Sequence, residues 1–309
     1  MPVLKIDDHL EYLAKSRGLS QSTLDNYTYA KDRLGIQEID TDNLSGLWTK
    51  LAELLPDVDA GTGRTLNGLP YGYLANFNGL VCGLLSLRNI NYKSYEYNIF
   101  RERLGKLSAH SPEAYTDEQL RLILKESRTS KGFGLFRVLL FLTYSGCRIS
   151  SAHGVKFSEM KEVPNYPKVL SVPLIGKGHR YTGIISKKAV EVMRFHNFSD
   201  LDLISGHKDT MKSSFAKYHR SLLIASIKRA GIFDVTENTD ATRSIRKWFT
   251  LRLANHGIDS DSISLLLGHV PQSLAFKVYA TAKGTTMEKL TQRVADAYCR
   301  SSLVDLEMW

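Results

Sequence analysis

The sequence predicts a mainly α-helical protein of two domains, with one small antiparallel β-sheet in the second. Apolar residues recur at helical spacing through most of the 309 residues. The pattern changes once to short apolar runs, which flank a glycine-bracketed turn at 176–179 and indicate a β-hairpin. Domains usually hold about 100–200 residues, so a chain of this length is expected to form two, each with its own core.

The first domain is expected over residues 1–105 and consists of helices. One of its helices can begin at Ser20 or Ser22, which are good N-cap residues. Residues 56–73 are rich in glycine and proline and predict a loop. A further helix is expected to contain the leucines of residues 80–87.

The second domain is expected over residues 112–309, after a boundary segment at 104–112 in which the helical period lapses. Thr116, followed by two acidic residues, has the pattern of a helix N-cap. Residues 133–144 are apolar enough for a buried helix, which ends at Gly146. Helical patterns resume after the hairpin and continue to the end of the chain.

The charge is distributed unevenly. The net charge of +9, from 41 basic and 32 acidic residues, lies in the second half of the chain. A basic domain favours a polyanionic partner, with nucleic acid as the first candidate, an anionic membrane as the second and a basic soluble enzyme as the ordinary alternative.

Other features of the sequence indicate the compartment. The longest apolar run, residues 138–144, is too short to cross a bilayer, and the N-terminal residues lack the apolar stretch of a signal peptide. The three cysteines form no CxxC pair, so neither a disulfide framework nor a zinc site is predicted. We therefore expect a cytoplasmic protein; nucleic acid as the partner of its basic domain would make it DNA-associated, with no membrane partner.

Six residues stand out as candidates for chemistry: Arg148, Lys177, Arg243, Arg246, His269 and Tyr279. Each has an ordinary structural explanation when taken singly, as a helix-end arginine, a turn lysine, a solvated helix face, a capping histidine or a packed tyrosine. Arg243 and Arg246 lie three residues apart and so share one face of a helix. The order and spacing of all six are much harder to explain by structure alone.

Together these motifs resemble those of the tyrosine recombinases, the phage-integrase and Xer-like family, over nearly the whole chain. The segment from the Leu-Leu-Gly-His motif, which ends at His269, to Tyr279 is the most specific part of the resemblance. Residues 10–34 also look like the helical core-binding domain of that family, which clamps DNA. The resemblance implies a core-binding domain followed by a catalytic domain, and the activity of a site-specific DNA recombinase or integrase.

The resemblance also implies a role for each residue. Tyr279 matches the nucleophile, which would form a 3′-phosphotyrosine with double-stranded DNA and release a 5′-hydroxyl. Arg148 and Arg246 match the two arginines that clamp the phosphate. Lys177 would give a proton to the leaving oxygen, and His269 would bond the phosphate or assist proton transfer. No metal ion and no cofactor is implied, because the arginines neutralise the developing charge.

Three features depart from the pattern of the family. Arg243 stands where histidine or lysine is usual, and a permanently protonated guanidinium cannot readily accept the tyrosine proton. Ser151 stands where an acidic residue commonly follows the first arginine. The interval from His269 to Tyr279 is one residue longer than is common. These departures suggest a divergent branch of viral, plasmid or archaeal type.

The C-terminal residues leave two alternatives open. Residues 285–298 have helical spacing, and an apolar end follows from Leu303 to Trp309. This tail can cap its own core, or it can dock on a neighbouring protomer as the C-terminal helix often does in the family. We expect a homo-oligomer, a tetramer on DNA, formed through the tail.

Two rival functions also stay open. A type IB topoisomerase-like enzyme would use the same residues to relax DNA without exchanging strands. A catalytically inactive DNA-binding protein could share the same scaffold. Three further tyrosines, Tyr181, Tyr218 and Tyr298, are expected to be structural and not to act as the nucleophile.

Overall fold

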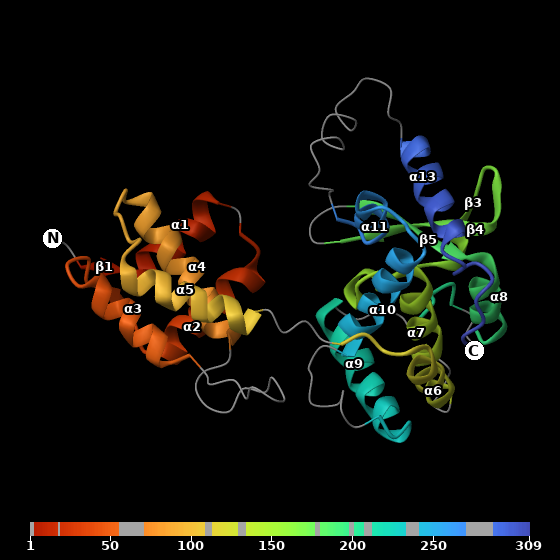
Figure 1. Ribbon diagram of the computed structural model, residues 1–309, viewed down its shortest axis with the longest axis horizontal. Coiled ribbons are helices and arrows are strands. Elements are labelled where there is room, and N and C mark those ends of the chain that lie inside the picture. The colour runs from red at the N-terminus through yellow and green to blue at the C-terminus, as the bar shows by residue number, and fades with distance from the viewer. Residues whose placement is uncertain are drawn as a thin grey trace. The chain divides into compact units, whose positions relative to one another are not determined.

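The computed structural model describes residues 3–17, 19–55, 71–108, 113–128, 134–176, 180–197, 201–206, 212–232, 241–269 and 287–309. The chain divides into two compact units, Met1–Ser111 and Pro112–Trp309. Helices dominate both units, and the strands form small antiparallel sheets (Figure 1). The predicted fold class is therefore confirmed.

The described part of the first unit consists of helices around one hydrophobic core, mostly aliphatic, with Trp48 at the centre of its aromatic contacts. The helices are α1 (Ile6–Ser16), α2 (Gln21–Leu34), α3 (Leu44–Glu53), α4 (Tyr71–Leu87) and α5 (Tyr95–Ser108), and β1 (Leu4–Lys5) pairs antiparallel with β2 (Glu38–Ile39). Ser20 is the N-cap residue of α2, as predicted. Trp48 is fully buried, and its ring lies 4.9 Å from that of Tyr97 and 5.8 Å from that of Phe100.

One boundary predicted for this unit is wrong. The loop expected at 56–73 extends too far, because α4 begins at Tyr71; residues 56–70 lie outside the described part of the chain. Leu74 and Phe77 are buried at helical spacing, and their packing outweighs the cost of a glycine in the first turn. The boundary segment expected at 104–112 contains the division between the two units at Ser111 and Pro112, and α5 continues into this segment as far as Ser108.

The second unit combines helices with a three-stranded sheet. Its described helices are α6 (Asp117–Ser127), α7 (Gly134–Ser145), α8 (Lys187–Phe195), α9 (Lys212–Arg229), α10 (Ala241–Asn255), α11 (Ser260–Leu266) and α13 (Met287–Arg300), with short 3-10 turns at Ile149–Ser151 and Phe157–Glu159. The strands are β3 (Lys161–Val163), β4 (Tyr166–Ile175) and β5 (Arg180–Ser186), in the order β3-β4-β5. Figure 1 shows α13 lying beside this sheet.

The predicted hairpin is confirmed as β4 and β5. The two strands pair antiparallel from Val169 opposite Ser186 to Ile175 opposite Arg180. The third strand, β3, was not predicted, because its three residues are too few to show an alternating pattern. The tip of the hairpin, residues 177–179, lies outside the described residues.

The core of the second unit forms around α7. Every residue of this helix is buried, as the apolar run predicted. Its one charged residue, Arg137, donates hydrogen bonds from Nε to the carbonyl of Ile204 at 2.8 Å and from Nη1 to the carbonyl of His196 at 2.5 Å. A buried guanidinium is tolerated where its donors meet acceptors in this way. The arginine thereby connects the core helix to two surface segments.

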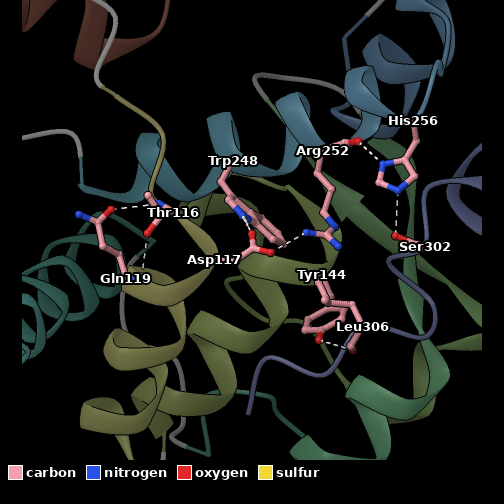
Figure 2. Close-up of polar contacts among 9 residues, drawn as sticks. All are labelled: Thr116, Asp117, Gln119, Tyr144, Trp248, Arg252, His256, Ser302 and Leu306. Atoms are coloured by element: carbon pink, nitrogen blue, oxygen red, sulfur yellow. Dashed lines mark hydrogen bonds and ion pairs between the residues drawn. The ribbon is translucent and has the colours of Figure 1, made fainter.

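The N-terminus of α6 has the predicted cap. The backbone N–H of Gln119 donates to Thr116 Oγ1 at 3.1 Å, and the N–H of Thr116 donates to Gln119 Oε1 at 3.0 Å (Figure 2). This reciprocal capping box satisfies two backbone donors that a helix otherwise leaves unpaired.

One face of α10 connects the beginning of the second unit to its end (Figure 2). Trp248 Nε1 donates to Asp117 Oδ1 at 2.7 Å, and Arg252 Nη1 lies 3.0 Å from Asp117 Oδ2. Near the C-terminus of the helix, His256 Nε2 lies 3.0 Å from Ser302 Oγ. The helix is therefore held by α6 and by the C-terminal segment at once.

The C-terminal tail packs against its own unit. Tyr144 Oη donates to the carbonyl of Leu306 at 2.6 Å (Figure 2). The ring centroids of Tyr144 and Trp309 lie 5.7 Å apart. Met308 is buried, with 1% of its surface exposed. Tyr298, expected to be structural, is fully buried and donates to the carbonyl of Tyr144 at 2.7 Å. Among the described helices, none has both the length and the apolar composition that a membrane span requires.

Candidate active site

Three of the six candidate residues meet at one point of the second unit. Arg148 begins the 3-10 turn that follows α7, Arg246 lies in α10, and His269 follows α11. Nη2 of Arg148 lies 2.7 Å from His269 Nε2, and Nη2 of Arg246 lies 3.1 Å from the same nitrogen. Residues far apart in the sequence thus form one cluster of two guanidinium groups and an imidazole, which we call the arginine–histidine cluster.

A glycine ends α7 and allows the chain to turn toward Arg148. Gly146 has a φ of 60°, in the left-handed region that favours glycine. A Cβ atom here would lie only 2.2 Å from the ring of Phe249 on α10, so the backbone approaches that helix closely. The carbonyl of Gly146 accepts a hydrogen bond from Arg246 Nη1 at 2.8 Å. The same turn therefore presents one arginine and anchors the other.

A second glycine sets the position of His269. The N–H of Gly268 donates to the carbonyl of Leu265 at 2.9 Å, and the N–H of His269 donates to the carbonyl of Ser264 at 2.8 Å. With a φ of 66° at Gly268, these bonds form the Schellman motif that ends many helices. The carbonyl of Leu267 accepts from Arg246 Nη2 at 2.8 Å. Hydrogen bonds therefore fix the turn of the Leu-Leu-Gly-His motif against the arginine.

The cluster is strongly electropositive. Burial, together with the neighbouring charge of Arg148, lowers the pKa of Arg246 to about 10. In the described ranges, no carboxylate forms an ion pair with Arg148 or Arg246. Because guanidinium groups only donate hydrogen bonds, His269 Nε2 is the acceptor in both contacts. This arrangement of donors suits an oxyanion such as a phosphate.

Two residues of the cluster's surroundings were not assigned to it from the sequence. The hydroxyls of Tyr181 and Ser151 are both buried, and the Tyr181 ring lies so close to Gly268 that a Cβ atom there would be 2.5 Å from it. Burial raises the pKa of Tyr181 to about 12. The only sequence signal for this placement was its position in the strand that follows the hairpin turn, next to a candidate lysine.

Of the other three candidates, Arg243 lies among the described residues and two do not. Arg243 lies on α10 one turn before Arg246, and its side chain is exposed. Lys177 and Tyr279 lie outside the described residues. The part of the chain that the structure describes contains no group of three His, Cys, Asp or Glu side chains that could hold a metal ion.

Comparison with known proteins finds likeness in structure and not in sequence. No protein-family model and no curated protein sequence matches the chain. The Tn1549 transposon integrase in complex with transposon right end DNA has a TM-score of 0.55 at 13% identity, covering 94% of this chain and 98% of that one. The same integrase with circular intermediate DNA has a TM-score of 0.54 at 14% identity, covering 94% and 99%. At such identities the likeness shows the fold, which extends over both units.

Proposed function

We propose that this chain, which has the tyrosine-recombinase fold that its motifs predicted, is a DNA strand transferase that cuts and rejoins DNA at specific sites. The observation that carries the proposal is the convergence of Arg148 and Arg246 on one point beside His269. Two guanidinium groups with no carboxylate ion pair among the described residues are suited to one dianionic transition state.

In the proposed reaction, one P–O bond forms as another breaks. The Tyr279 hydroxyl attacks the phosphorus of a DNA phosphodiester, which forms a 3′-phosphotyrosine and releases the 5′ oxygen. Lys177 gives its proton to that oxygen, so a 5′-hydroxyl leaves. Attack by a 5′-hydroxyl on the phosphotyrosine then restores a phosphodiester and frees Tyr279. Because the bond energy is kept in the covalent intermediate, rejoining needs no nucleotide cofactor.

The arginine–histidine cluster stabilises the charge that builds during both steps. The phosphoryl oxygens that become more negative accept hydrogen bonds from Arg148 and Arg246. His269 bonds the phosphate and assists the transfer of the proton that Tyr279 loses, since an imidazole can both accept and donate a proton near neutral pH. Arg243 is exposed and permanently charged, so it serves as a phosphate contact and not as a general base.

The two units suggest how the DNA is held. The second unit carries the basic excess of the chain, which suits contacts to backbone phosphates. In the proposed complex, both units contact the duplex, as in the clamp that the resemblance implies, and four copies assemble on paired DNA sites. The C-terminal tail joins neighbouring copies there, in exchange for the contacts that it makes within one chain.

A nicked DNA substrate tests the proposal directly. Duplexes with randomised sequence and a nick next to each cleavage position trap the covalent intermediate, because the released fragment diffuses away. The native chain is expected to form a covalent adduct that denaturing gel electrophoresis separates, and Tyr279→Phe is expected to form none while it still binds DNA.

The same experiment separates the rival functions. An adduct accompanied by relaxation of supercoiled DNA, but by no joining of strands from two duplexes, identifies a type IB topoisomerase-like enzyme. DNA binding with no adduct from the native chain identifies an inactive DNA-binding protein and overturns the proposal.

A further inference from the structure

Arg293 of α13 holds the N-terminus of α11. Its Nε donates to Ser262 Oγ at 3.2 Å, and its Nη2 donates to Asp259 Oδ1 at 3.1 Å. Asp259 is the N-cap residue of α11, and its two carboxylate oxygens accept from the N–H of Ser262 at 2.9 Å and from Ser262 Oγ at 2.7 Å. We call these three residues, Asp259, Ser262 and Arg293, the Arg293 bridge.

The contacts of the Arg293 bridge form a closed set. The buried hydroxyl of Ser262 accepts from Arg293 and donates to Asp259, so both of its hydrogen-bonding functions are used. Burial acts to raise the pKa of Asp259, but the hydrogen bonds from Ser262 and the charge of Arg293 outweigh it and lower the pKa. The guanidinium contacts two partners along one edge, which its planar fork permits and the single ammonium of a lysine does not reproduce.

The Arg293 bridge and His269 lie at opposite ends of α11. The helix has seven residues, so it spans about 10 Å in two turns. The N–H of Ile263 donates to the carbonyl of Asp259 at 3.0 Å, and the N–H of Leu267 donates to the carbonyl of Ile263 at 3.0 Å. These backbone hydrogen bonds connect the N-cap to the turn that carries His269, so a change in the direction of the helix at Asp259 moves His269.

The position of His269 depends on this helix because its own side chain is exposed and not fixed by burial. Nε2 of His269 lies 2.7 Å from Arg148 Nη2 and 3.1 Å from Arg246 Nη2, and a displacement of about 1 Å would lengthen such contacts beyond hydrogen-bond distance. Arg246 bonds the carbonyl of Leu267 at the cluster end of α11. The helix is therefore held at one end by α10 and at the other by α13.

We propose that Arg293 is a positioning residue: through Asp259 and Ser262 it sets the direction of α11, and so it places His269 Nε2 at the arginine–histidine cluster. The effect on the reaction rests on the proposed function. The placement of His269 does not, because it can be measured in the absence of DNA.

The variant Arg293→Met removes both hydrogen bonds of the guanidinium and keeps an aliphatic stem. Arg300→Met is the matched control, because Arg300 lies on the same helix and pairs with an aspartate at 3.0 Å, but that partner, Asp296, also belongs to α13. Asp259→Asn keeps the N-cap and loses the charge, so it provides a second variant if Arg293→Met folds poorly. Thermal unfolding of all three establishes that they are folded before any comparison.

The first measurement needs no DNA. The ring signals of His269 in the full chain can be observed by proton–nitrogen NMR and assigned by their loss in His269→Gln. Arg293→Met is expected to shift these signals, because Nε2 moves relative to the two guanidinium groups, and Asp259→Asn is expected to shift them less. Arg300→Met should leave them unchanged. A purely structural role would lower the unfolding temperature without moving the His269 signals of the folded chain, and that result would overturn the proposal.

The second measurement is the rate of adduct formation on the nicked duplexes. Arg293→Met is expected to slow adduct formation about tenfold at saturating DNA, with an unchanged apparent affinity for DNA, because a misplaced group costs rate and not binding. In a chain that already carries His269→Ala, the same substitution should change the rate by less than about twofold, since the group that it positions has been removed. A loss of about tenfold in both backgrounds would show that Arg293 does not act through His269.

The two measurements also separate this inference from the proposed function. If the native chain forms an adduct and Arg293→Met matches its rate, the positioning role is wrong and the proposed function stands. If the native chain forms no adduct while the His269 signals shift in Arg293→Met, the proposed function is wrong and the placement of His269 by Arg293 stands.

Discussion

Arg148 and Arg246 share one acceptor, since the Nη2 atoms of both lie within 3.1 Å of His269 Nε2. One nitrogen lone pair thus faces two positively charged groups whose mutual repulsion contributes to the lowered pKa of Arg246. A bound phosphate offers several oxygens in place of that one nitrogen, so anion binding relieves the competition between the two arginines.

Removal of either arginine is expected to slow adduct formation on the nicked duplexes. Arg148→Ala and Arg246→Ala should each lower the rate by about 10²–10³-fold, because each removes a preorganised donor from the phosphate. Single-turnover gel assays measure the rate. Arg220→Ala, on the exposed side of α9, is the control and is expected to react at the native rate. Native rates in both cluster variants would contradict the assigned roles.

Substitution of two glycines by alanine can distinguish the cost of a strained backbone from the cost of a steric clash. Gly257 and Gly268 have similar φ angles of 70° and 66°, but a Cβ atom at Gly257 meets nothing within 4 Å. Gly257→Ala is therefore expected to cost about 1–2 kcal/mol from strain alone. Gly268→Ala should cost a further 1–3 kcal/mol, because its methyl group collides with the Tyr181 ring.

Urea unfolding of the two variants measures both costs. Adduct formation should also slow in Gly268→Ala alone, because only this substitution displaces the turn before His269. Equal stability and equal rates in the two variants would show that the contact with Tyr181 is absent in solution.

The carboxylate of Asp117 is expected to stabilise the fold in a pH-dependent way. Burial acts to raise its pKa, but the hydrogen bond from Trp248 and the charge of Arg252 outweigh this effect, so the net pKa lies below the ordinary 3.8. A lowered pKa in the folded state means that the stabilisation is present above about pH 4 and is lost as the pH falls through the folded value.

Asp117→Asn measures this contribution by thermal unfolding at a series of pH values. The variant should be less stable than the native chain by about 1 kcal/mol at pH 7, since the carboxylate is partly exposed and solvent screens its charge. The difference should close below pH 4. Asp8→Asn, at an exposed position of the first unit, is the control. A difference that stays constant down to pH 2 would contradict this assignment.

The tail packing predicts which C-terminal substitution destabilises the chain. Met308→Ala is expected to cost about 2–5 kcal/mol, because the side chain is fully buried. Glu307→Ala should cost less than about 1 kcal/mol, since it removes only an exposed ion pair with Lys188. Denaturant unfolding at several protein concentrations measures both. A cost that depends on concentration would show that the tail packs on a second copy of the chain.

Binding to random-sequence duplex DNA should depend steeply on salt. If the basic second unit contacts about 6–10 phosphates, the affinity falls about 10³–10⁵-fold between 50 and 200 mM salt, because released counterions drive the association. Fluorescence anisotropy measures the slope. An affinity that does not change with salt would contradict a nucleic-acid partner.

Much of the fold could be predicted because local signals coincided with packing. Thr116 has both the side chain and the following sequence of a helix cap, and it forms one. The run that became α7 is apolar on all sides, which only a fully buried helix satisfies. The errors fall where packing overrides a local signal, as at Tyr71, where a helix begins inside a segment rich in glycine and proline.

Less of the candidate site than of the fold could be predicted from the sequence. Arg148, Arg246 and His269 were identified by motif order, and the structure brings them together; their catalytic roles stay predictions. Tyr181 was expected to be an ordinary packed tyrosine. No local sequence pattern indicates that its strand, β5, packs against the turn at Gly268. Contacts between a strand and a distant turn depend on tertiary structure, which spacing along the chain does not encode.

The contacts of α10 connect any movement of the C-terminal segment to the arginine–histidine cluster. Arg246 lies on this helix and contacts the cluster. Further along, Arg252 donates to Asp117, and His256 lies 3.0 Å from Ser302 of the C-terminal segment (Figure 2). Because a helix moves as one unit, a shift of Arg252 and His256 would also shift Arg246. Release of the last residues by a neighbouring molecule would therefore also displace the Arg246 guanidinium, and in the proposed reaction this would couple subunit assembly to catalysis.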